Sequence, residues 1–153
     1  MKENTRVKQI YDSLVERGLA AKYGYAGVYS ISIENTLVYI GKSIHMLERV
    51  AEHLAEIEKR NPTSNKYKVL KEAVARGYSI NFDVLFVASC GAKGAKRSIG
   101  YKEGALIRQY MPPLNYQIPD SRGYKHYTTN PRAKTITLDE IMKDQFEDVE
   151  KIS

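Results

Sequence analysis

The chain has 153 residues, 42% of them hydrophobic and 27% charged, which is typical of one soluble domain and leaves little room for a second. A chain of this length can bury enough surface to fold without a disulfide or a structural metal, and its one cysteine, Cys90, excludes an internal disulfide. No apolar run approaches the ~20 residues that a membrane span needs. The N-terminal stretch has no signal-peptide core, so we expect a cytoplasmic protein with no membrane partner.

The charge is unevenly distributed along the chain. Lys and Arg number 24 against 18 Asp and Glu, a net of +6. Residues 1–134 hold 22 basic and 12 acidic residues, a net of +10, whereas residues 135–153 hold 2 and 6, a net of −4. A basic body favours a phosphate-backbone partner, although proteins that bind no nucleic acid also show it. The acidic tail is interpreted as a solvated helix face, with competition against DNA as the alternative.

The apolar periodicity predicts a small mixed fold. It predicts helices over residues 5–17, from Ser43 to Asn61-Pro62, from Asn65 to Gly77, over 98–110 and over 138–152. Short stretches rich in β-branched and aromatic residues predict strands over 26–33, 37–41 and 79–88. The fold class is therefore α/β (α+β), a small three-stranded antiparallel sheet flanked by helices.

Local signals mark the boundaries of these elements. Ser43 is expected to cap the helix that follows it, and Pro112-Pro113 must end the helix over 98–110 because proline supplies no amide donor. The small, basic stretch 89–97 is predicted to be a flexible loop that lacks the spacing of a phosphate-binding P-loop. Cys90 within it is interpreted as a small buried residue without a catalytic role.

Residues able to carry chemistry follow one another in a recognisable order. Gly27-Val28-Tyr29 is followed, after nine intervening residues, by Tyr39-Ile40-Gly41-Lys42-Ser43. Arg49 and His53 come next, four residues apart and therefore on one face of a helix. Much later come Glu103 and the segment Pro112-Pro113-Leu114-Asn115.

This series resembles the GIY-YIG nuclease family, whose signature has a GIY strand, a YIG strand, an Arg with a His or Tyr one turn later, and a distant Glu followed by Asn. The match extends from residue 27 to residue 115, with Val28 in place of Ile. It implies an N-terminal helix over 1–22, a catalytic domain over 23–116 with an insertion at about 60–78, and a C-terminal extension over 117–153 that ends in an acidic helix.

The resemblance implies that Tyr29 is the general base that activates a water molecule, with Tyr39 and His53 as its hydrogen-bonding neighbours. A free phenol has a pKa near ~10 and is a poor base at neutral pH. We therefore expect Lys42, Arg49 and a bound metal to lower the pKa of Tyr29. Which group deprotonates the water stays open at this point.

The remaining matched residues are expected to handle the phosphate and the metal. Arg49 would contact the scissile phosphate, and Lys42 would be a second cation there. Glu103 would be the single metal ligand, holding one Mg²⁺ or Mn²⁺ per active site through one carboxylate and water molecules. Asn115 would orient the Glu103 region or a backbone phosphate.

The two tyrosines constrain the hairpin that carries them. Strand side chains alternate between faces, so Tyr29 and Tyr39 share a face only if the connection between the strands adds an odd number of residues. We expect a three-residue connection, Glu34-Asn35-Thr36, in which Asn35 or Thr36 absorbs the bulge.

Basic residues outside the motif are candidates for DNA contact. Lys93, Lys96 and Arg97 precede the predicted helix over 98–110, and Arg122 and Lys125 are interleaved with aromatic residues, which suits backbone contact or base stacking. Polar surface loops are an equally good interpretation of both stretches.

The sequence thus predicts a metal-dependent DNA endonuclease of restriction or phage type. Cutting both strands with one site per chain implies a homodimer or a larger homo-oligomer. Two alternatives stay open: a structure-specific DNA repair nuclease, and a catalytically inactive DNA-binding module that kept the fold.

Overall fold

The computed structural model describes the parts of the chain that hold the predicted motif, namely residues 2–19, 25–62, 64–88, 92–115, 117–119, 125–127 and 136–143. Cys90, Arg122 and the second half of the predicted C-terminal helix lie outside these residues, as do the side chains of Lys93 and Lys125. The predictions for these groups therefore stay predictions.

A three-stranded antiparallel sheet lies at the centre of the fold. β1 (Gly27–Ile33) is the middle strand and pairs with β2 (Thr36–Ser43) on one side and with β3 (Ile80–Val87) on the other. The three strands lie within two residues of the predicted boundaries. The predicted α+β class and the predicted sheet are confirmed.

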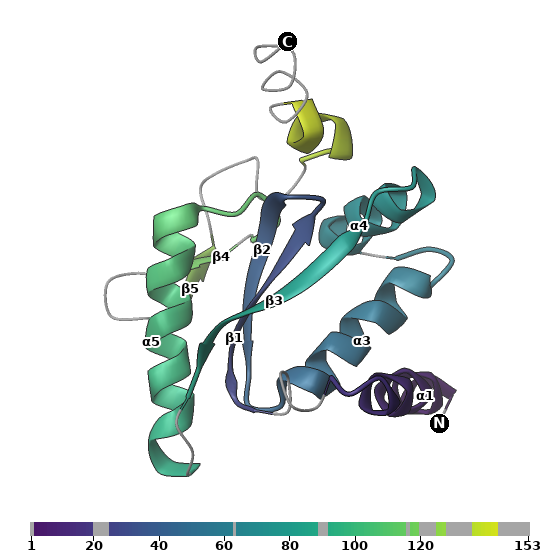
Figure 1. The fold of residues 1–153 in the computed structure, drawn as a ribbon. Helices are drawn as coiled ribbons and strands as arrows, with labels where there is room; N and C mark the ends of the chain where they lie inside the picture. The colour runs from purple at the N-terminus through teal and green to yellow at the C-terminus, as the bar shows by residue number, and fades with distance from the viewer. Residues whose placement is uncertain are drawn as a thin grey trace.

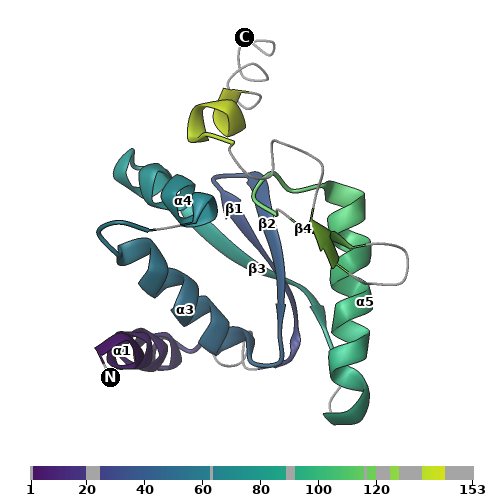
Figure 2. The same cartoon turned by 180° about the vertical axis from the view of Figure 1, so that it is seen from behind.

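Helices cover both faces of this sheet (Figures 1 and 2). α3 (Met46–Glu58) and α4 (Asn65–Ala75) lie against one face, and α1 (Lys2–Glu16) packs on α3. α5 (Ala92–Tyr110) lies along the opposite face. The sheet is therefore the middle of three layers, and its side chains reach two separate helical layers.

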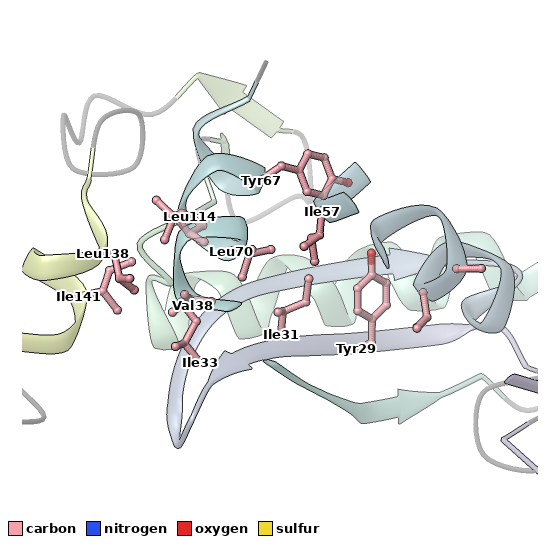
Figure 3. Close-up of a cluster of buried hydrophobic side chains, with 14 of the residues drawn as sticks. Tyr29, Ile31, Ile33, Val38, Ile57, Tyr67, Leu70, Leu114, Leu138 and Ile141 are labelled. Carbon is pink, nitrogen blue, oxygen red and sulfur yellow. The ribbon is translucent and has the colours of Figure 1, made fainter. Parts of the chain in front are cut away.

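Alternating side chains of β1 build one core on each face. Tyr29, Ile31 and Ile33 belong to the core against α3 and α4, and Figure 3 shows the Tyr29 hydroxyl pointing away from the strand toward these helices. The core against α5 consists of Val28, Ile40, Ala88, Ile99 and Ile107. β1 is buried on both faces, which explains why its side chains are apolar apart from the small residues Ser30 and Ser32.

The predicted start of α4 is correct, whereas the predicted N-cap of α3 is wrong. α4 begins at Asn65 as expected, and the Ser64 hydroxyl accepts a 3.3 Å hydrogen bond from the Tyr67 backbone N–H. Ser43, in contrast, does not cap α3. It ends β2, and its hydroxyl accepts a 2.9 Å hydrogen bond from the backbone N–H of His45, which occupies the N-cap position itself.

The prediction of a flexible loop over residues 89–97 is wrong for residues 92–97, which are helical. α5 begins at Ala92, six residues before the predicted start. Ala, Lys and Arg have high helix propensities, and they compensate for Gly94, which costs about 1 kcal/mol in a helix interior. The helix ends at Tyr110, directly before Met111 (φ 45°) and the two prolines, as predicted.

The hairpin reaches the expected geometry by a different route. Ile33 pairs with Thr36, so the turn contains two residues, Glu34 and Asn35, and not three. The odd residue lies inside β2: Ile31 pairs with Tyr39 and Ser32 with Leu37, which leaves Val38 as a β-bulge. The bulge restores the parity, and the rings of Tyr29 and Tyr39 lie on one face with centroids 6.5 Å apart.

The C-terminal part adds short elements. β4 (Gln117–Pro119) and β5 (Lys125–Tyr127) form a two-stranded sheet that the sequence did not predict. Residues 138–143 are helical, as predicted. Leu138, Ile141 and Met142 are buried in the core beside α3 and α4, so this segment is more than a solvated acidic face.

Gly41 offers a direct test of the hairpin packing. A Cβ at this position would lie 2.5 Å from the Tyr29 Oη and 2.9 Å from the Tyr39 ring. We expect Gly41→Ala to lower the free energy of unfolding by about 1–3 kcal/mol, because a buried ring must move to admit the methyl group. Urea denaturation followed by circular dichroism measures this change.

The matched control is Gly94→Ala, since a Cβ at Gly94 meets nothing within 4 Å and alanine favours a helix. This variant should be as stable as the wild type or slightly more stable. An equal loss of stability in both variants would contradict the proposed packing.

Candidate active site

The Tyr29 hydroxyl is buried and bound to a histidine. Tyr29 is 1% exposed in the middle strand, and its ring lies over Gly41, the residue that faces it on β2. Its Oη lies 2.5 Å from the Nε2 of His53, a buried residue of α3. A buried phenol is costly without a hydrogen-bond partner, so this pairing explains how the core can accept Tyr29.

His53 uses both ring nitrogens. Its Nδ1 lies 2.7 Å from the hydroxyl of Tyr67, which is a buried residue of α4. Tyr39 lies beside the pair, with its ring centroid 5.9 Å from that of His53 in an edge-on arrangement. We call Tyr29, Tyr39, His53 and Tyr67 the tyrosine–histidine cluster.

Two residues of α4 near this cluster were missed by sequence reasoning. Lys66 and Tyr67 lie in the helix predicted from Asn65 to Gly77, but neither was predicted to be a site residue. The Lys66 Nζ lies 4.3 Å from the centroid of the Tyr39 ring and 4.6 Å from that of Tyr67. No motif spacing marks either residue, because they reach the cluster from a separate helix inside the predicted insertion.

Arg49 brings a positive charge to the same face. One turn before His53 on α3, it is half-buried and forms a 2.6 Å ion pair with Glu52. Its positive charge also acts on the hydroxyl of Tyr29. Four of the predicted site residues are thus brought together: Tyr29, Tyr39, Arg49 and His53.

The surroundings shift the pKa values of the cluster away from the expected direction. Burial raises the pKa of Tyr29 above its ordinary value of 10, Tyr39 raises it further, and Arg49 opposes the increase. Burial raises the pKa of Tyr67 to about 12. The expectation that neighbouring side chains lower the pKa of Tyr29 is therefore wrong. Arg49 does lower this pKa, but desolvation of the phenolate raises it by more.

His53 is kept neutral by its environment. Burial, followed by the positive charges of Lys66 and Arg49, holds the pKa of His53 well below its ordinary value of 6.5. Each of these effects penalises the imidazolium. At neutral pH His53 therefore has one protonated nitrogen and one that accepts a hydrogen bond.

Glu103 and Lys42 lie on the opposite face of the sheet. Glu103 is 2% exposed on α5, between Ile99 and Ile107 on the helix face that packs on the sheet. The Lys42 Nζ lies 3.5 Å from where a Cβ on Gly100 would be, and Gly100 is three residues before Glu103 on α5. The helical period therefore brings Lys42 near the Glu103 side of α5.

Asn115 binds to β2, the strand whose side chains reach both the tyrosine–histidine cluster and the α5 side of the sheet. Its side-chain Oδ1 accepts a 2.9 Å hydrogen bond from the Ile40 backbone N–H, and its Nδ2 donates one of 2.8 Å to the Ile40 carbonyl. The Leu114 backbone N–H donates to the Val38 carbonyl at 2.9 Å. The segment after the two prolines thus covers part of the outer edge of β2, while a contact from Asn115 to Glu103 or to a phosphate stays a prediction.

The predicted DNA-contact residues of α5 lie at its exposed start. Lys96 and Arg97 are exposed, and Lys93 belongs to the first turn of the same helix. Lys125 lies in β5. These positions lie on helix and strand, where the sequence predicted loops.

Two further findings concern the described residues alone. No described helix is long and apolar enough to cross a membrane. Within the same part of the chain, no three His, Cys, Asp or Glu side chains gather into a group that could hold a metal. A site that relies on one carboxylate would not form such a group.

The sequence matches no protein-family model and no curated protein. Among solved structures, the chain is similar to a mutant of EndoII from bacteriophage T4, with 24% sequence identity, 60% of this chain and 74% of that chain covered, and a TM-score of 0.45. The resemblance to the GIY-YIG family is carried by the motif residues.

The lowered pKa of His53 predicts a loss of stability in mild acid. The unfolded chain takes up a proton on this histidine near pH 6.5, whereas the folded protein does not, so the stabilisation is present above about pH 6.5 and declines as the pH falls. We expect the free energy of unfolding to fall by up to about 1.4 kcal/mol per pH unit from this residue. Urea denaturation between pH 5 and pH 8 measures the slope.

The variant His53→Gln should lack this part of the slope, while His45→Gln, at an exposed histidine before α3, should keep it. A wild-type slope that persists unchanged in His53→Gln would contradict the prediction.

Proposed function

We propose that this chain is a GIY-YIG nuclease that hydrolyses phosphodiester bonds of DNA with the help of one divalent metal ion. The observation that carries the proposal is the buried hydrogen bond between Tyr29 and His53, with Arg49 beside it. A core gains little from burying two polar rings and placing a cation next to them. The same residues form the signature of the family that the sequence resembles.

The cluster can activate water through a proton relay. The Tyr29 oxygen accepts a proton from the attacking water while its own proton passes to the Nε2 of His53, 2.5 Å away. The hydroxide then attacks the phosphorus, the bond to the leaving oxygen breaks, and that oxygen takes a proton from solvent. This relay does not require a free phenolate, which the raised pKa of Tyr29 disfavours.

The DNA itself helps His53 to accept that proton. The charges of Arg49 and Lys66 lower the pKa of His53 in the free protein. A phosphate bound beside them brings negative charge, which offsets both effects and favours the imidazolium. The relay is therefore better suited to the complex with DNA than to the free protein.

The alternation of β2 supports a phosphate position at the edge of this strand. Tyr39 and Gly41 face the tyrosine–histidine cluster, whereas Ile40 and Lys42 face α5. β2 is the outer strand of the sheet, so a phosphate at its edge can be reached from both faces. Arg49 and Lys42 would contact the phosphate from the two sides and stabilise the charge that develops on it.

Glu103 fits the role of metal ligand. It is a buried carboxylate near a lysine, in a region where Gly100 adds no side chain of its own. Mg²⁺ and Mn²⁺ prefer oxygen ligands, and Mg²⁺ often binds through one or two carboxylates and several waters. Bound there, the ion would act as a Lewis acid at the phosphate and stabilise the leaving oxygen.

The exposed start of α5 would hold the duplex next to the site. Lys96 and Arg97 can neutralise phosphates along the backbone, together with Lys93, Arg122 and Lys125. We further propose restriction- or phage-type cleavage in the cytoplasm, by a homodimer or a larger homo-oligomer that brings one site to each strand.

A plasmid-nicking assay tests the enzyme and its metal ligand. The wild type should convert supercoiled DNA in the presence of Mg²⁺ or Mn²⁺ and not in the presence of EDTA. We expect Glu103→Gln to reduce the rate at least about a hundredfold, because it removes the charge that holds the ion and keeps the shape of the side chain. Glu16→Gln, at an exposed residue of α1, should cleave like the wild type.

The pattern of products separates the alternatives. Discrete fragments would indicate sequence recognition, and cleavage limited to branched substrates would favour the repair nuclease. If the wild type cleaved neither plasmid, branched nor single-stranded DNA while binding it, the inactive DNA-binding module would replace the nuclease.

Charge reversal tests the proposed DNA-contact face. We expect the double variant Lys96→Glu, Arg97→Glu to weaken binding to a short duplex about tenfold or more, and to reduce the slope of log K against log salt by about 2. Fluorescence anisotropy at several salt concentrations measures both quantities. The charge-matched control is Lys8→Glu, Arg17→Glu on the α1 side, which should bind nearly as well as the wild type; equal effects of both double variants would contradict this face.

A further inference from the structure

The helix α4 lies in the stretch predicted as an insertion, yet it supplies a partner to the proposed catalytic cluster. The Tyr67 hydroxyl lies 2.7 Å from the Nδ1 of His53, and both residues are buried. Figure 3 shows Tyr67 on the same side of β1 as Tyr29. His53 is therefore held between two phenols that come from different elements, β1 and α4.

A neutral histidine between two phenols has only two arrangements. One ring nitrogen donates and the other accepts, so one phenol must accept a hydrogen bond from His53 and the other must donate one to it. The positive charge of Arg49 acts on the Tyr29 oxygen and favours a hydroxyl proton that points away from it, toward His53. The Tyr29 proton is then directed to the Nε2 of His53, and the Nδ1–H of His53 is directed to the Tyr67 oxygen.

We propose that Tyr67 is a positioning residue of this nuclease, which holds His53 in the Nδ1–H tautomer and so leaves Nε2 free to accept the Tyr29 proton. This inference rests on the proposed function for its effect on the reaction, but the tautomer itself is a property of the free protein. The other tautomer would place a proton on Nε2 and block the transfer from Tyr29.

The surroundings of Tyr67 suit a fixed acceptor. Its ring lies under the Lys66 ammonium group, which also lies over Tyr39, so one cation contacts two rings of the cluster. The backbone of Tyr67 is also fixed at the start of α4, because its N–H donates a hydrogen bond to the hydroxyl of the N-cap residue Ser64. The hydroxyl thus has a defined place relative to His53.

The variant Tyr67→Phe tests the proposal, because it removes the hydroxyl and keeps the ring that packs in the core. We expect kcat for plasmid nicking to fall at least about tenfold while KM for DNA changes little, since Tyr67 acts through His53 and does not touch the substrate. Tyr11→Phe, at the exposed surface of α1, is the matched control and should keep the wild-type kcat.

Nitrogen NMR provides a readout that does not depend on activity. In the ¹⁵N-labelled wild type, the shifts of His53 should show a protonated Nδ1 and an unprotonated Nε2 at pH 7.5. In Tyr67→Phe the population of the Nε2–H tautomer should rise, and in Tyr11→Phe the spectrum should match the wild type.

Each result decides one of the two proposals. An Nε2–H tautomer in the wild type would overturn the role of Tyr67, even if Tyr67→Phe failed to fold. A folded Tyr67→Phe variant with wild-type kcat, or one with a lowered kcat and unchanged His53 shifts, would overturn it as well. A wild type that cleaves no DNA would overturn the proposed function, and the tautomer measurement would still decide how Tyr67 positions His53.

Discussion

The buried hydroxyl of Tyr29 is the constraint on which the rest of the site depends. A phenol at 1% exposure in the middle strand needs a hydrogen-bond partner, and His53 supplies it at 2.5 Å. That bond fixes how α3 lies on the sheet, and the second nitrogen of His53 in turn ties α4 to the same point. In the proposed mechanism, structural and catalytic requirements therefore coincide: the pairing that lets the core accept Tyr29 would also provide a path for its proton.

The outer strand β2 joins the two halves of the proposed site. The bulge at Val38 places Tyr39 on the face of Tyr29, and the alternation of the strand then places Lys42 toward α5 and Glu103. Asn115 binds both backbone groups of Ile40 at the centre of this segment. Asn115 thus stabilises the strand that places Tyr39 on one face of the sheet and Lys42 on the other. This is a physical reason for an asparagine at this position of the motif.

Much of the fold could be predicted because its elements are locally specified. The strands are rich in β-branched residues, and the two prolines end α5 whatever their surroundings. The errors have definite causes. Ser43 was predicted to cap a helix because serine is a common N-cap residue, but in the structure it is the last residue of β2. The start of α5 was predicted too late because its first turns contain glycine, whose cost is offset by the neighbouring helix-forming residues. The sequence predicted that Tyr29 and Tyr39 share a face, which requires one extra residue in the hairpin. It could not show whether this residue lies in the turn or in a bulge, because both place the two tyrosines on the same face.

The sequence by itself determined which residues are proposed to bear the chemistry, because Tyr29, Tyr39, Arg49, His53 and Glu103 follow one another in the order of the signature that the chain resembles. Only the tertiary structure decided how these residues are divided between the two faces of the sheet. It also decided that burial raises the pKa of Tyr29 above its ordinary value, against the opposing effect of Arg49. Tyr67 joins the tyrosine–histidine cluster for the same reason: hydrogen bonding and desolvation depend on distances between elements, and these distances are set by packing and not by spacing along the chain.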